Sequence, residues 1–198
     1  MEKRLNFKLL LSSPDFKDPK PELEQYITPT EIVIEILKKI NSLGHLSGKV
    51  ADLGCGTGRI SIGAACLGAD VTGFEIDEDA LKIAKDYCKT NSLKVKWVCS
   101  AVENIEEEFD TVIMNPPFGA QRPGADRSFL QKALEIGRNI WTIHMAGTKD
   151  FIERFVGKNG GVIVNSYEFD FPLNKTMSFH KMELNKQRAI LYHIASLR

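Results

Sequence analysis

The chain has 198 residues, 43% of them hydrophobic, and a formal net charge of zero. This length suits one well-packed domain and is short for two, and a neutral molecule does not attract nucleic acid as a whole. The charge is uneven, however, because residues 1–110 carry a net charge of −5 and residues 111–198 a net charge of +5. The second half can therefore face phosphates, which permits a nucleic-acid substrate without requiring one.

Cysteine usage and hydropathy predict a cytoplasmic protein. Cys55, Cys66, Cys88 and Cys99 are widely spaced, with no C-x-x-C pair and no histidine at ligand spacing, so we expect neither a metal site nor a disulfide framework. No apolar run approaches membrane-spanning length, and Lys8 interrupts the only candidate near the amino terminus. We therefore expect reduced thiols and no membrane segment.

The first 28 residues are expected to form an extension of a single domain that spans residues 1–198, with the core over residues 29–198. Residues 1–21 are rich in turn formers, and a helix is predicted over residues 29–43. Thr28 is its expected N-cap, with Pro29 at the first helical position and Glu31 completing a capping box. Gly44 would end the helix. Its apolar stripe would hold residues 25–28 in a fixed place on the domain.

Strands then alternate with helices. Strands are expected over residues 49–53, 70–74, 95–99, 109–114, 161–168 and 189–194, and helices over residues 59–67, 78–91, 128–139 and 148–157. This alternation predicts an α/β fold with a parallel, doubly wound sheet that gains antiparallel character late. Residues 119–126 are too rich in turn formers for a regular element and suit a substrate-clamping loop.

A glycine-rich stretch, the glycine loop of residues 54–58, lies between an expected strand and helix. Gly54, Gly56 and Gly58 let the backbone approach a ligand closely and leave helix N–H groups free. The loop lacks the full G-x-G-x-x-G spacing, and Asp52 in front of it would repel a pyrophosphate. A carboxylate there suits a cationic cofactor such as S-adenosylmethionine, and Glu75 is placed to meet ribose hydroxyls. Alternatively, each carboxylate only makes local hydrogen bonds.

The expected strand of residues 109–114 ends in a tetrapeptide with specific chemistry, the NPPF motif: Asn115, Pro116, Pro117 and Phe118. Asn115 offers a side-chain carbonyl, and Pro116 offers a backbone carbonyl without an N–H beside it. Two successive acceptors suit an –NH₂ group such as the adenine amine or a side-chain amide, and holding both hydrogens would favour an available lone pair on nitrogen. Phe118 supplies a face for base stacking. The alternative interpretation is a strand-ending turn.

The glycine loop preceded by Asp52, together with the NPPF motif, resembles S-adenosylmethionine-dependent amino-group methyltransferases of the Rossmann-like class. The sequence is more closely similar to the methyltransferase-like protein 5 family and its archaeal relatives, which methylate the 6-amino group of an adenosine in small-subunit ribosomal RNA. The similarity extends over residues 23–28, 73–81, 111–119 and 179–181. It implies a mostly parallel seven-stranded sheet of this methyltransferase type, with S-adenosyl-L-methionine as cofactor.

Carried over by position, the resemblance implies that Gln25 and Thr28 close over the methionine part of the cofactor and that Glu75 binds its ribose. The full implied cofactor set is Gln25, Tyr26, Thr28, Asp52, Gly54, Cys55, Gly56, Thr57, Gly58, Arg59, Glu75, Ile76, Ala101 and Val102. The family pattern has an aspartate for the cofactor's adenine amine where this chain has Ala101. Ser100, Glu103 or backbone atoms would replace it, or the cofactor would bind more weakly.

The resemblance also implies partners. Family members commonly depend on a small zinc-binding activator protein that covers an exposed sheet edge, which implies a heterodimer. Contacts to phosphates of an RNA substrate are expected from the basic residues Arg122, Arg127, Lys175, His180, Lys181 and Arg188. Each of these is alternatively an ordinary solvated charge. Trp141, His144 and His193 are expected to pack in the core and not to catalyse.

Three other functions share part of this pattern. A protein glutamine-amide methyltransferase of the release-factor type needs the same two acceptors, although Phe118 and residues 25–28 favour the nucleic-acid branch. A DNA adenine methyltransferase is disfavoured because 198 residues leave no room for a separate target-recognition domain. A catalytically inert binding or activator subunit is disfavoured because the NPPF motif is intact.

Overall fold

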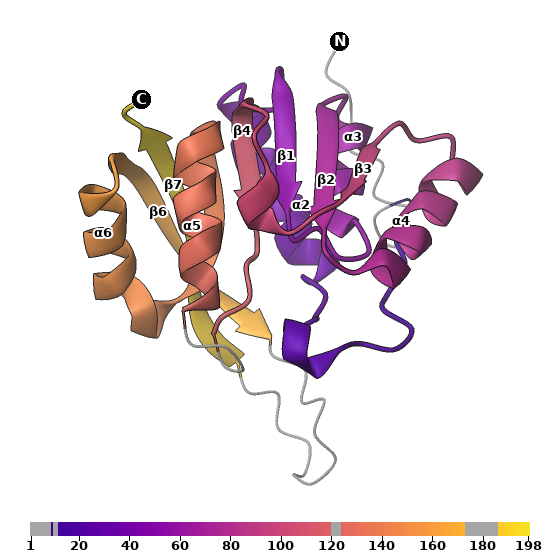
Figure 1. Ribbon diagram of the computed structural model, residues 1–198, viewed down its shortest axis with the longest axis horizontal. Coiled ribbons are helices and arrows are strands. Elements are labelled where there is room, and N and C mark those ends of the chain that lie inside the picture. The colour runs from indigo at the N-terminus through magenta and orange to yellow at the C-terminus, as the bar shows by residue number, and fades with distance from the viewer. Residues whose placement is uncertain (1–8, 10–11, 120–123, 173–185) are drawn as a thin grey trace, which may run out of the picture.

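Seven strands form one sheet in the order β3-β2-β1-β4-β5-β7-β6 (Figure 1). The structure is a computed structural model that describes residues 9, 12–119, 124–172 and 186–198. The strands are β1 (Lys49–Leu53), β2 (Asp70–Glu75), β3 (Lys96–Cys99), β4 (Phe109–Met114), β5 (Gly137–Met145), β6 (Gly161–Pro172) and β7 (Lys186–Ser196). Strands β1 to β5 are parallel, and β7 runs antiparallel to both β5 and β6. The expected doubly wound α/β sheet with late antiparallel character is confirmed.

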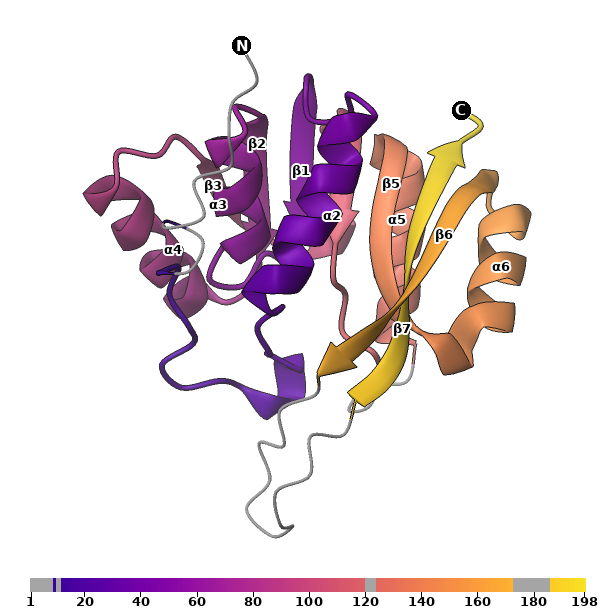
Figure 2. The same ribbon diagram turned by 180° about the vertical axis from the view of Figure 1, so that it is seen from behind.

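Helices cover both faces of the sheet. They are α2 (Thr30–Ser42), α3 (Arg59–Cys66), α4 (Glu78–Thr90), α5 (Ala125–Ile136) and α6 (Lys149–Lys158), with short 3₁₀ turns η1 (Pro21–Leu23), η2 (Val102–Asn104) and η3 (Ala146–Thr148). Figures 1 and 2 show α5 and α6 on one face and α2 and α3 on the other. This arrangement explains why the central strands are apolar on both sides.

The core consists of two buried layers, one on each face. Val50 of β1 belongs to the layer that contains α2 and α3, whereas the next residue, Ala51, belongs to the layer that contains α5 and α6. Such alternation follows from the two-residue period of a strand. Leu37 of α2 and Leu130 of α5 are fully buried, and burial of a leucine side chain contributes about 1.5–3 kcal/mol to stability.

The helix predicted over residues 128–139 was placed wrongly. Helix α5 begins at Ala125 and ends at Ile136, and the chain then forms strand β5, which the sequence pattern did not separate from the helix. Gly137 marks the change, because a Cβ there would lie 2.6 Å from Cγ2 of Val112 in β4. The buried run of residues 140–144 lacks alternation, so periodicity alone could not distinguish it from a buried helix.

The capping box predicted at Thr28 was also wrong. Pro29 is the N-cap of α2 and makes no side-chain capping bond, and the helix begins at Thr30. The Thr28 hydroxyl instead accepts a hydrogen bond from Asn115, 87 residues away. The end of α2 is as expected, with Gly44 in a left-handed conformation (φ 75°) just after the C-cap Leu43.

All carboxyl ends of the parallel strands lie at one edge of the sheet, the lower edge in Figure 1. Residues 12–28 pass along this edge, so the extension expected from the sequence reaches the place where α/β sheets bind ligands. In the described ranges, no helix is both long enough and apolar enough to cross a membrane.

Candidate active site at the carboxyl edge of the sheet

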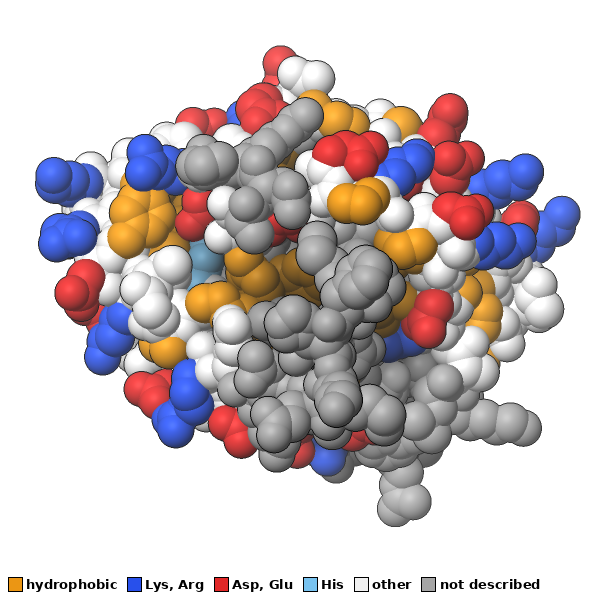
Figure 3. All heavy atoms as spheres, turned by 90° about the horizontal axis from the view of Figure 1, so that it is seen from below, with side chains coloured by type: hydrophobic (Ala, Val, Ile, Leu, Met, Phe, Trp, Pro, Cys, Tyr) orange, Lys and Arg blue, Asp and Glu red, His pale blue; other side chains and the backbone are white. Residues whose placement is uncertain are grey.

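A cavity with a volume of about 470 Å³ lies at this edge, within the range of about 300–1,000 Å³ that is typical of small-molecule sites. Its walls come from residues 22–28, the glycine loop, the ends of β2 and β3, and the NPPF motif. Seen from this side, hydrophobic side chains gather in the middle of the molecule, and lysines and arginines lie toward its margins (Figure 3).

Most of the predicted cofactor residues line this cavity. They are Gln25, Tyr26, Thr28, Asp52, Gly54, Cys55, Gly56, Thr57, Arg59, Glu75, Ile76, Ala101 and Val102. Gly58 does not line it. Gly58 is the N-cap of α3 with φ 87°, and a Cβ there would lie 2.4 Å from Cη2 of Trp97. Its requirement for glycine is therefore structural, because the loop must turn tightly against Trp97.

Glu75, at the end of β2, organises the glycine loop. Its Oε2 accepts the backbone N–H of Gly56 at 2.8 Å, and its Oε1 accepts the N–H groups of Ile76 and Asp77 at 2.9 and 3.0 Å. Glu75 is 9% exposed and lines the cavity. A carboxylate has about four acceptor positions, so Glu75 retains acceptor capacity toward a ligand hydroxyl.

Asp52 is a buried carboxylate at the floor of the cavity. It is 1% exposed, and its Oδ2 accepts a hydrogen bond from the Ser61 hydroxyl at 2.6 Å. Burial raises the pKa of Asp52 to about 7, although the Ser61 hydrogen bonds oppose this rise. A cationic ligand in the cavity would favour the ionised form.

The amino-terminal extension is fastened to the glycine loop. The Arg59 guanidinium donates to the hydroxyl and backbone carbonyl of Ser13 and pairs with Asp15 at 2.7 Å. The Thr57 hydroxyl donates to the Pro14 carbonyl at 2.8 Å. Phe16 packs against the loop so closely that a Cβ on Gly56 would lie 2.7 Å from its ring. Phe16 also lines the cavity, and no local signal in the sequence indicated it.

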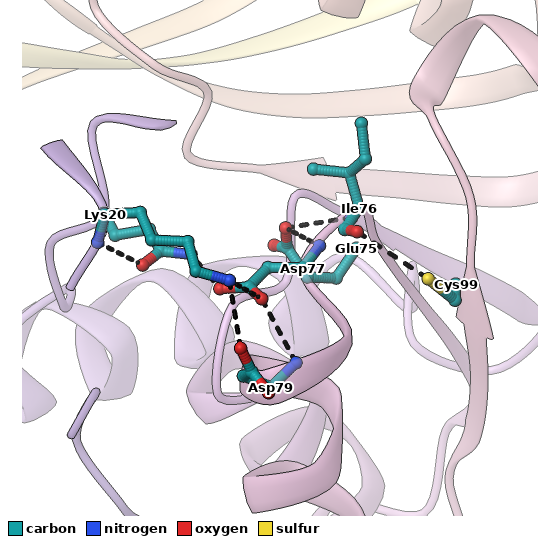
Figure 4. A network of polar contacts seen from close by, with 7 residues as sticks. Lys20, Glu75, Ile76, Asp77, Asp79 and Cys99 are labelled. Carbon is teal, nitrogen blue, oxygen red and sulfur yellow. Dashed lines mark hydrogen bonds and ion pairs between the residues drawn. The ribbon is translucent and has the colours of Figure 1, made fainter. Parts of the chain in front are cut away.

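A second fastening joins residues 20–25 to the start of α4 (Figure 4). The Lys20 ammonium group contacts Asp77 at 2.6 Å and Asp79 at 3.1 Å, and the Gln25 amide donates to Asp77 at 2.6 Å. Burial acts against ionisation of Asp77, but the hydrogen bonds from Lys20 and Gln25 hold its pKa below the usual value. The partners are separated by more than 50 residues, so sequence analysis did not identify this network.

The end of β3 supplies another wall of the cavity, where an aspartate of the family pattern is replaced by Ala101. The Ala101 carbonyl already accepts hydrogen bonds from the Ser100 hydroxyl and the Asn104 N–H. Glu103 lines the cavity and is exposed. Of the substitutes considered from the sequence, the Glu103 carboxylate and the Ser100 hydroxyl oxygen both line this wall and can each accept a hydrogen bond.

The two acceptors of the NPPF motif, the Asn115 side-chain oxygen and the Pro116 carbonyl, differ in their hydrogen bonding. The Asn115 Nδ2 donates to the Thr28 hydroxyl at 2.9 Å, while the Asn115 Oδ1 is buried and has no hydrogen-bond partner among the described residues. The Pro116 carbonyl accepts a hydrogen bond from the Tyr26 hydroxyl at 3.2 Å. A buried amide oxygen without a partner is costly unless a ligand satisfies it. Asn115 and Pro117 line the cavity, whereas Pro116 and Phe118 do not.

Two aromatic rings, Tyr26 and Phe171, pack against Phe118 of the motif. Phe118 stacks on Tyr26 with ring centroids 5.1 Å apart, and both rings meet Phe171 of β6 edge-on at about 6 Å. Burial raises the pKa of the Tyr26 hydroxyl well above its usual value, so this group remains a donor. Phe118 is therefore a packed ring that retains partial exposure.

The structure describes two of the six residues that were predicted to contact RNA, Arg127 and Arg188. Arg127 is exposed and lies over the Phe151 ring at 5.0 Å, and Arg188 is paired with Glu168. Neither lines the cavity. Arg122, Lys175, His180 and Lys181 lie outside the described residues.

Trp141, His144 and His193 pack in the core, as expected. Trp141 is fully buried, and His193 stacks on it with centroids 4.4 Å apart. Burial lowers the pKa of His144 to about 3 and that of His193 to about 4. Both rings are therefore neutral near pH 7.

This donor set fits S-adenosylmethionine. Gly54 and Gly56 have positive φ, which lets the backbone follow a ligand closely, and the carboxylate residues Glu75 and Asp52 both line the cavity, where they suit a ligand with hydroxyl and cationic groups. The fold and the site therefore define an S-adenosylmethionine-dependent methyltransferase of the Rossmann-like class.

Comparison with known proteins identifies the family. The family model "Methyltransferase small domain" matches residues 28–142. An uncharacterized protein of Methanocaldococcus jannaschii is 36% identical over 100% of this chain and 96% of its own length. The rRNA N(6)-adenosine-methyltransferase METTL5 of Danio rerio is 39% identical over 84% of this chain and 85% of its own length. The chain belongs to the methyltransferase small-domain family, and within it to the METTL5 family.

A solved structure agrees with this assignment. The crystal structure of a protein from Pyrococcus horikoshii superimposes with a TM-score of 0.90. The two chains are 35% identical, and the match covers 100% of this chain and 99% of the other. The resemblance stated from the motifs is thus confirmed, together with the seven-stranded methyltransferase fold.

Proposed function

We propose that the chain transfers a methyl group from S-adenosylmethionine to the 6-amino group of an adenosine in RNA, specifically in small-subunit ribosomal RNA. The main observation behind this proposal is the Oδ1 atom of Asn115. This acceptor is buried, has no hydrogen-bond partner among the described residues, and belongs to a residue that lines the cavity. The METTL5 relatives are named as enzymes that act on adenosine N6 of rRNA, which supports the substrate class.

The chemistry of the site suits an amine. One hydrogen of the target –NH₂ would bind to the Asn115 Oδ1, and the other would bind to the second lone pair of the Pro116 carbonyl. These two hydrogen bonds favour a more pyramidal amine nitrogen. Its lone pair is then available to attack the methyl group. S-adenosylmethionine supplies the electrophilic methyl group when bound. The proton released after transfer can leave to water, and the proposal requires no general base.

An adenosine amine inside a duplex is paired and stacked, so the target must be unpaired or flipped out. The proposed phosphate contacts are the basic residues named from the sequence, among which the described Arg127 and Arg188 are exposed. The described arginines named as RNA contacts do not line the cavity, which agrees with a role in docking the RNA backbone and not in holding the base.

The strongest rival remains a protein glutamine-amide methyltransferase. A side-chain amide also offers two hydrogens, so the Asn115 and Pro116 geometry does not separate the two substrates. Phe118 lies outside the cavity and is packed on Tyr26, but its ring keeps partial exposure, and a base stacked on this exposed part would favour RNA over an amide. DNA adenine and an inert subunit are the remaining alternatives.

We also propose a heterodimer with a small zinc-binding activator and a cytoplasmic location. In the described sheet, β3 and β6 are the two outermost strands, and each pairs with one neighbour. Unpaired strand edges favour addition of a strand from a partner. All four cysteines are free, which agrees with a reducing compartment. The whole chain would act as one domain, with residues 12–28 completing its cofactor site.

One experiment separates the substrates. The purified chain, alone and with a zinc-binding activator, is incubated with methyl-labelled S-adenosylmethionine and unmodified small-subunit ribosomal RNA. Large-subunit RNA, single-stranded DNA and a release-factor protein are parallel substrates. Label recovered as 6-methyladenosine from small-subunit RNA alone supports the proposal. Label in glutamine, in DNA or in large-subunit RNA instead would overturn the corresponding part of it.

A further inference from the structure

Arg127 lies beside the cavity and is held there from two sides. It belongs to the first turn of α5, between Gly124 and Ser128, which both line the cavity. Its side chain folds back over Gly124, because a Cβ on this glycine would lie 3.4 Å from Cδ and 3.5 Å from Nε of Arg127. On the other side, the guanidinium carbon lies 5.0 Å from the centre of the Phe151 ring of α6. These contacts place a cation at the rim of the site.

The guanidinium of Arg127 is open to an anionic ligand. Arg127 is exposed, and among the described residues its side chain forms no ion pair. Arg188, in contrast, is paired with Glu168. The neighbouring carboxylate of Asp126 is buried, with 8% of the residue exposed. The five N–H donors of an arginine form a rigid planar fork that matches a phosphate group. Arg127 therefore presents donors with a restricted orientation at the rim.

We propose that Arg127, held by Phe151, binds a phosphate that joins the target adenosine to a neighbouring nucleotide of the RNA. The inference rests on the proposed function and adds the place where the RNA backbone meets the site. A flipped base that enters the cavity leaves its two flanking phosphates outside, at the rim. A guanidinium fixed there can bind one of them with two parallel hydrogen bonds. Phe151 is thus a positioning residue that acts on Arg127 through a cation–π contact.

Helix α6 supplies matched controls for both residues. Phe155 lies one turn after Phe151, with the ring centroids 5.7 Å apart, and both rings pack, partly buried, against the same core layer. In the described ranges, cations lie over Phe151 and Tyr167 and not over Phe155. Arg154 is an exposed arginine of the same helix. It is the control for loss of one positive charge.

The first test is binding of a short oligouridine with one central adenosine, measured by fluorescence anisotropy with S-adenosylhomocysteine present. Arg127→Gln should weaken binding about tenfold, as for loss of a hydrogen bond between charged groups. Arg154→Gln should weaken it less than about twofold. Phe151→Leu should weaken binding about two- to fivefold, as for loss of an exposed cation–π contact, and Phe155→Leu should leave it unchanged. In the Arg127→Gln background the Phe151→Leu cost should disappear.

Neutral methylphosphonate linkages identify the phosphate. One linkage at a time is replaced, and the reference oligonucleotide carries matched 2′-O-methyl groups. The Arg127→Gln cost should vanish when one of the two linkages beside the adenosine is neutral, and it should persist when a terminal linkage is neutral. The same cost at every linkage would overturn the proposal, because Arg127 would then add only to the general positive surface. A Phe151→Leu cost that persists without Arg127 would overturn the positioning role.

A second measurement needs no RNA. In ¹⁵N-labelled protein, the Nε–H signal of Arg127 is assigned by its loss in Arg127→Gln. Because an aromatic ring shifts the resonances of groups above its face, this signal should move in Phe151→Leu and stay in place in Phe155→Leu. An unmoved signal in Phe151→Leu would refute the contact.

The two proposals fail in different ways. If the wild-type chain binds an all-uridine oligonucleotide as tightly as the one with adenosine, the proposed function is contradicted, and this inference with it. A preference for adenosine without a linkage-dependent Arg127→Gln cost would refute this inference alone.

Discussion

The backbone N–H of Gly56 donates to Oε2 of Glu75 at 2.8 Å, and this bond joins the glycine loop to the end of β2. The same carboxylate accepts the N–H groups of Ile76 and Asp77. Glu75 therefore shapes two of the chain segments that surround the cavity, in addition to the ribose contact proposed for it. A side chain that organises the site and binds the ligand should affect stability and affinity together.

For Glu75→Gln we expect lower stability of the fold and weaker cofactor binding. The amide nitrogen would face backbone donors that need an acceptor, and a buried donor left unsatisfied costs about 1–3 kcal/mol. Unfolding by urea should show this loss, and calorimetry should show at least about tenfold weaker S-adenosylmethionine binding. Glu78→Gln, an exposed glutamate at the start of α4, is the control and should leave both quantities unchanged. Wild-type affinity in Glu75→Gln would contradict this role.

Substitution by alanine should have opposite effects on the free energy of unfolding at Gly58 and at Gly157. At Gly58 the backbone has φ 87° and a Cβ would lie 2.4 Å from Trp97, so Gly58→Ala should lower the free energy of unfolding by about 2–4 kcal/mol. Gly157 lies in α6, and a Cβ added there would have nothing within 4 Å, so Gly157→Ala should raise the free energy of unfolding by about 0.5–1 kcal/mol. Chemical denaturation of both variants measures this, and similar effects at the two positions would contradict the loop geometry.

Cofactor affinity should depend on the ionisation of Asp52. Burial raises its pKa to about 7 in the folded protein, so the carboxylate prevails above this pH and the neutral acid below it. A cationic ligand favours the carboxylate, and its affinity should therefore rise as the pH increases from 6 to 8. Below pH 7 the decline should approach about tenfold per pH unit. Without ligand, the raised pKa means that Asp52 lowers stability progressively as the pH rises from the unfolded value toward 7.

Calorimetric titration with S-adenosylmethionine at pH 6, 7 and 8 measures this dependence. Asp52→Asn provides the control, because it removes the titrating group and leaves ionisation of the cofactor itself unchanged. The variant should bind more weakly at pH 8 and show a flatter pH profile. Identical profiles for the two proteins would show that Asp52 does not contact the cationic part of the cofactor electrostatically.

The contacts of Lys20 and Gln25 with the start of α4 should slow release of the cofactor. Lys20 and Gln25 both bind Asp77, and residues 22–28 form a wall of the cavity. In Lys20→Met this wall loses one fastening, so the dissociation rate of the cofactor should rise several-fold. Salt screens partly exposed ion pairs, so salt should accelerate release from the wild type and have little effect on the variant. Stopped-flow displacement measures both rates, with Lys17→Met as control. An unchanged rate would show that this contact does not limit release.

The parts of the site that sequence analysis predicted are those formed by neighbouring residues. Asp52, the glycine loop, Glu75 and the NPPF motif each lie at or just beyond the end of a strand, and the carboxyl ends of parallel strands must meet at one edge. Their presence around one cavity was therefore predictable before the order of the strands was known.

The parts that were missed depend on contacts across the chain. Thr28 was assigned to a helix cap because serine and threonine often cap helices, yet its hydroxyl is bound to Asn115. Phe16 and Lys20 carry no local signal, and only the path of residues 12–28 brings Phe16 to the cavity and Lys20 to Asp77. Strand β5 was missed because its buried run of residues 140–144 is continuous, without a two-residue alternation, and follows a helix directly.

The measurement that tests the account most directly separates methyl transfer from cofactor binding in Asn115→Ala. The account predicts that labelled methyl transfer to adenosine falls below detection while the S-adenosylmethionine dissociation constant stays within a few-fold of wild type. Asn104→Ala, an exposed asparagine of η2, should retain both. Loss of transfer and cofactor binding together would show that Asn115 is structural, and retained transfer would show that its carbonyl does not hold the target amine.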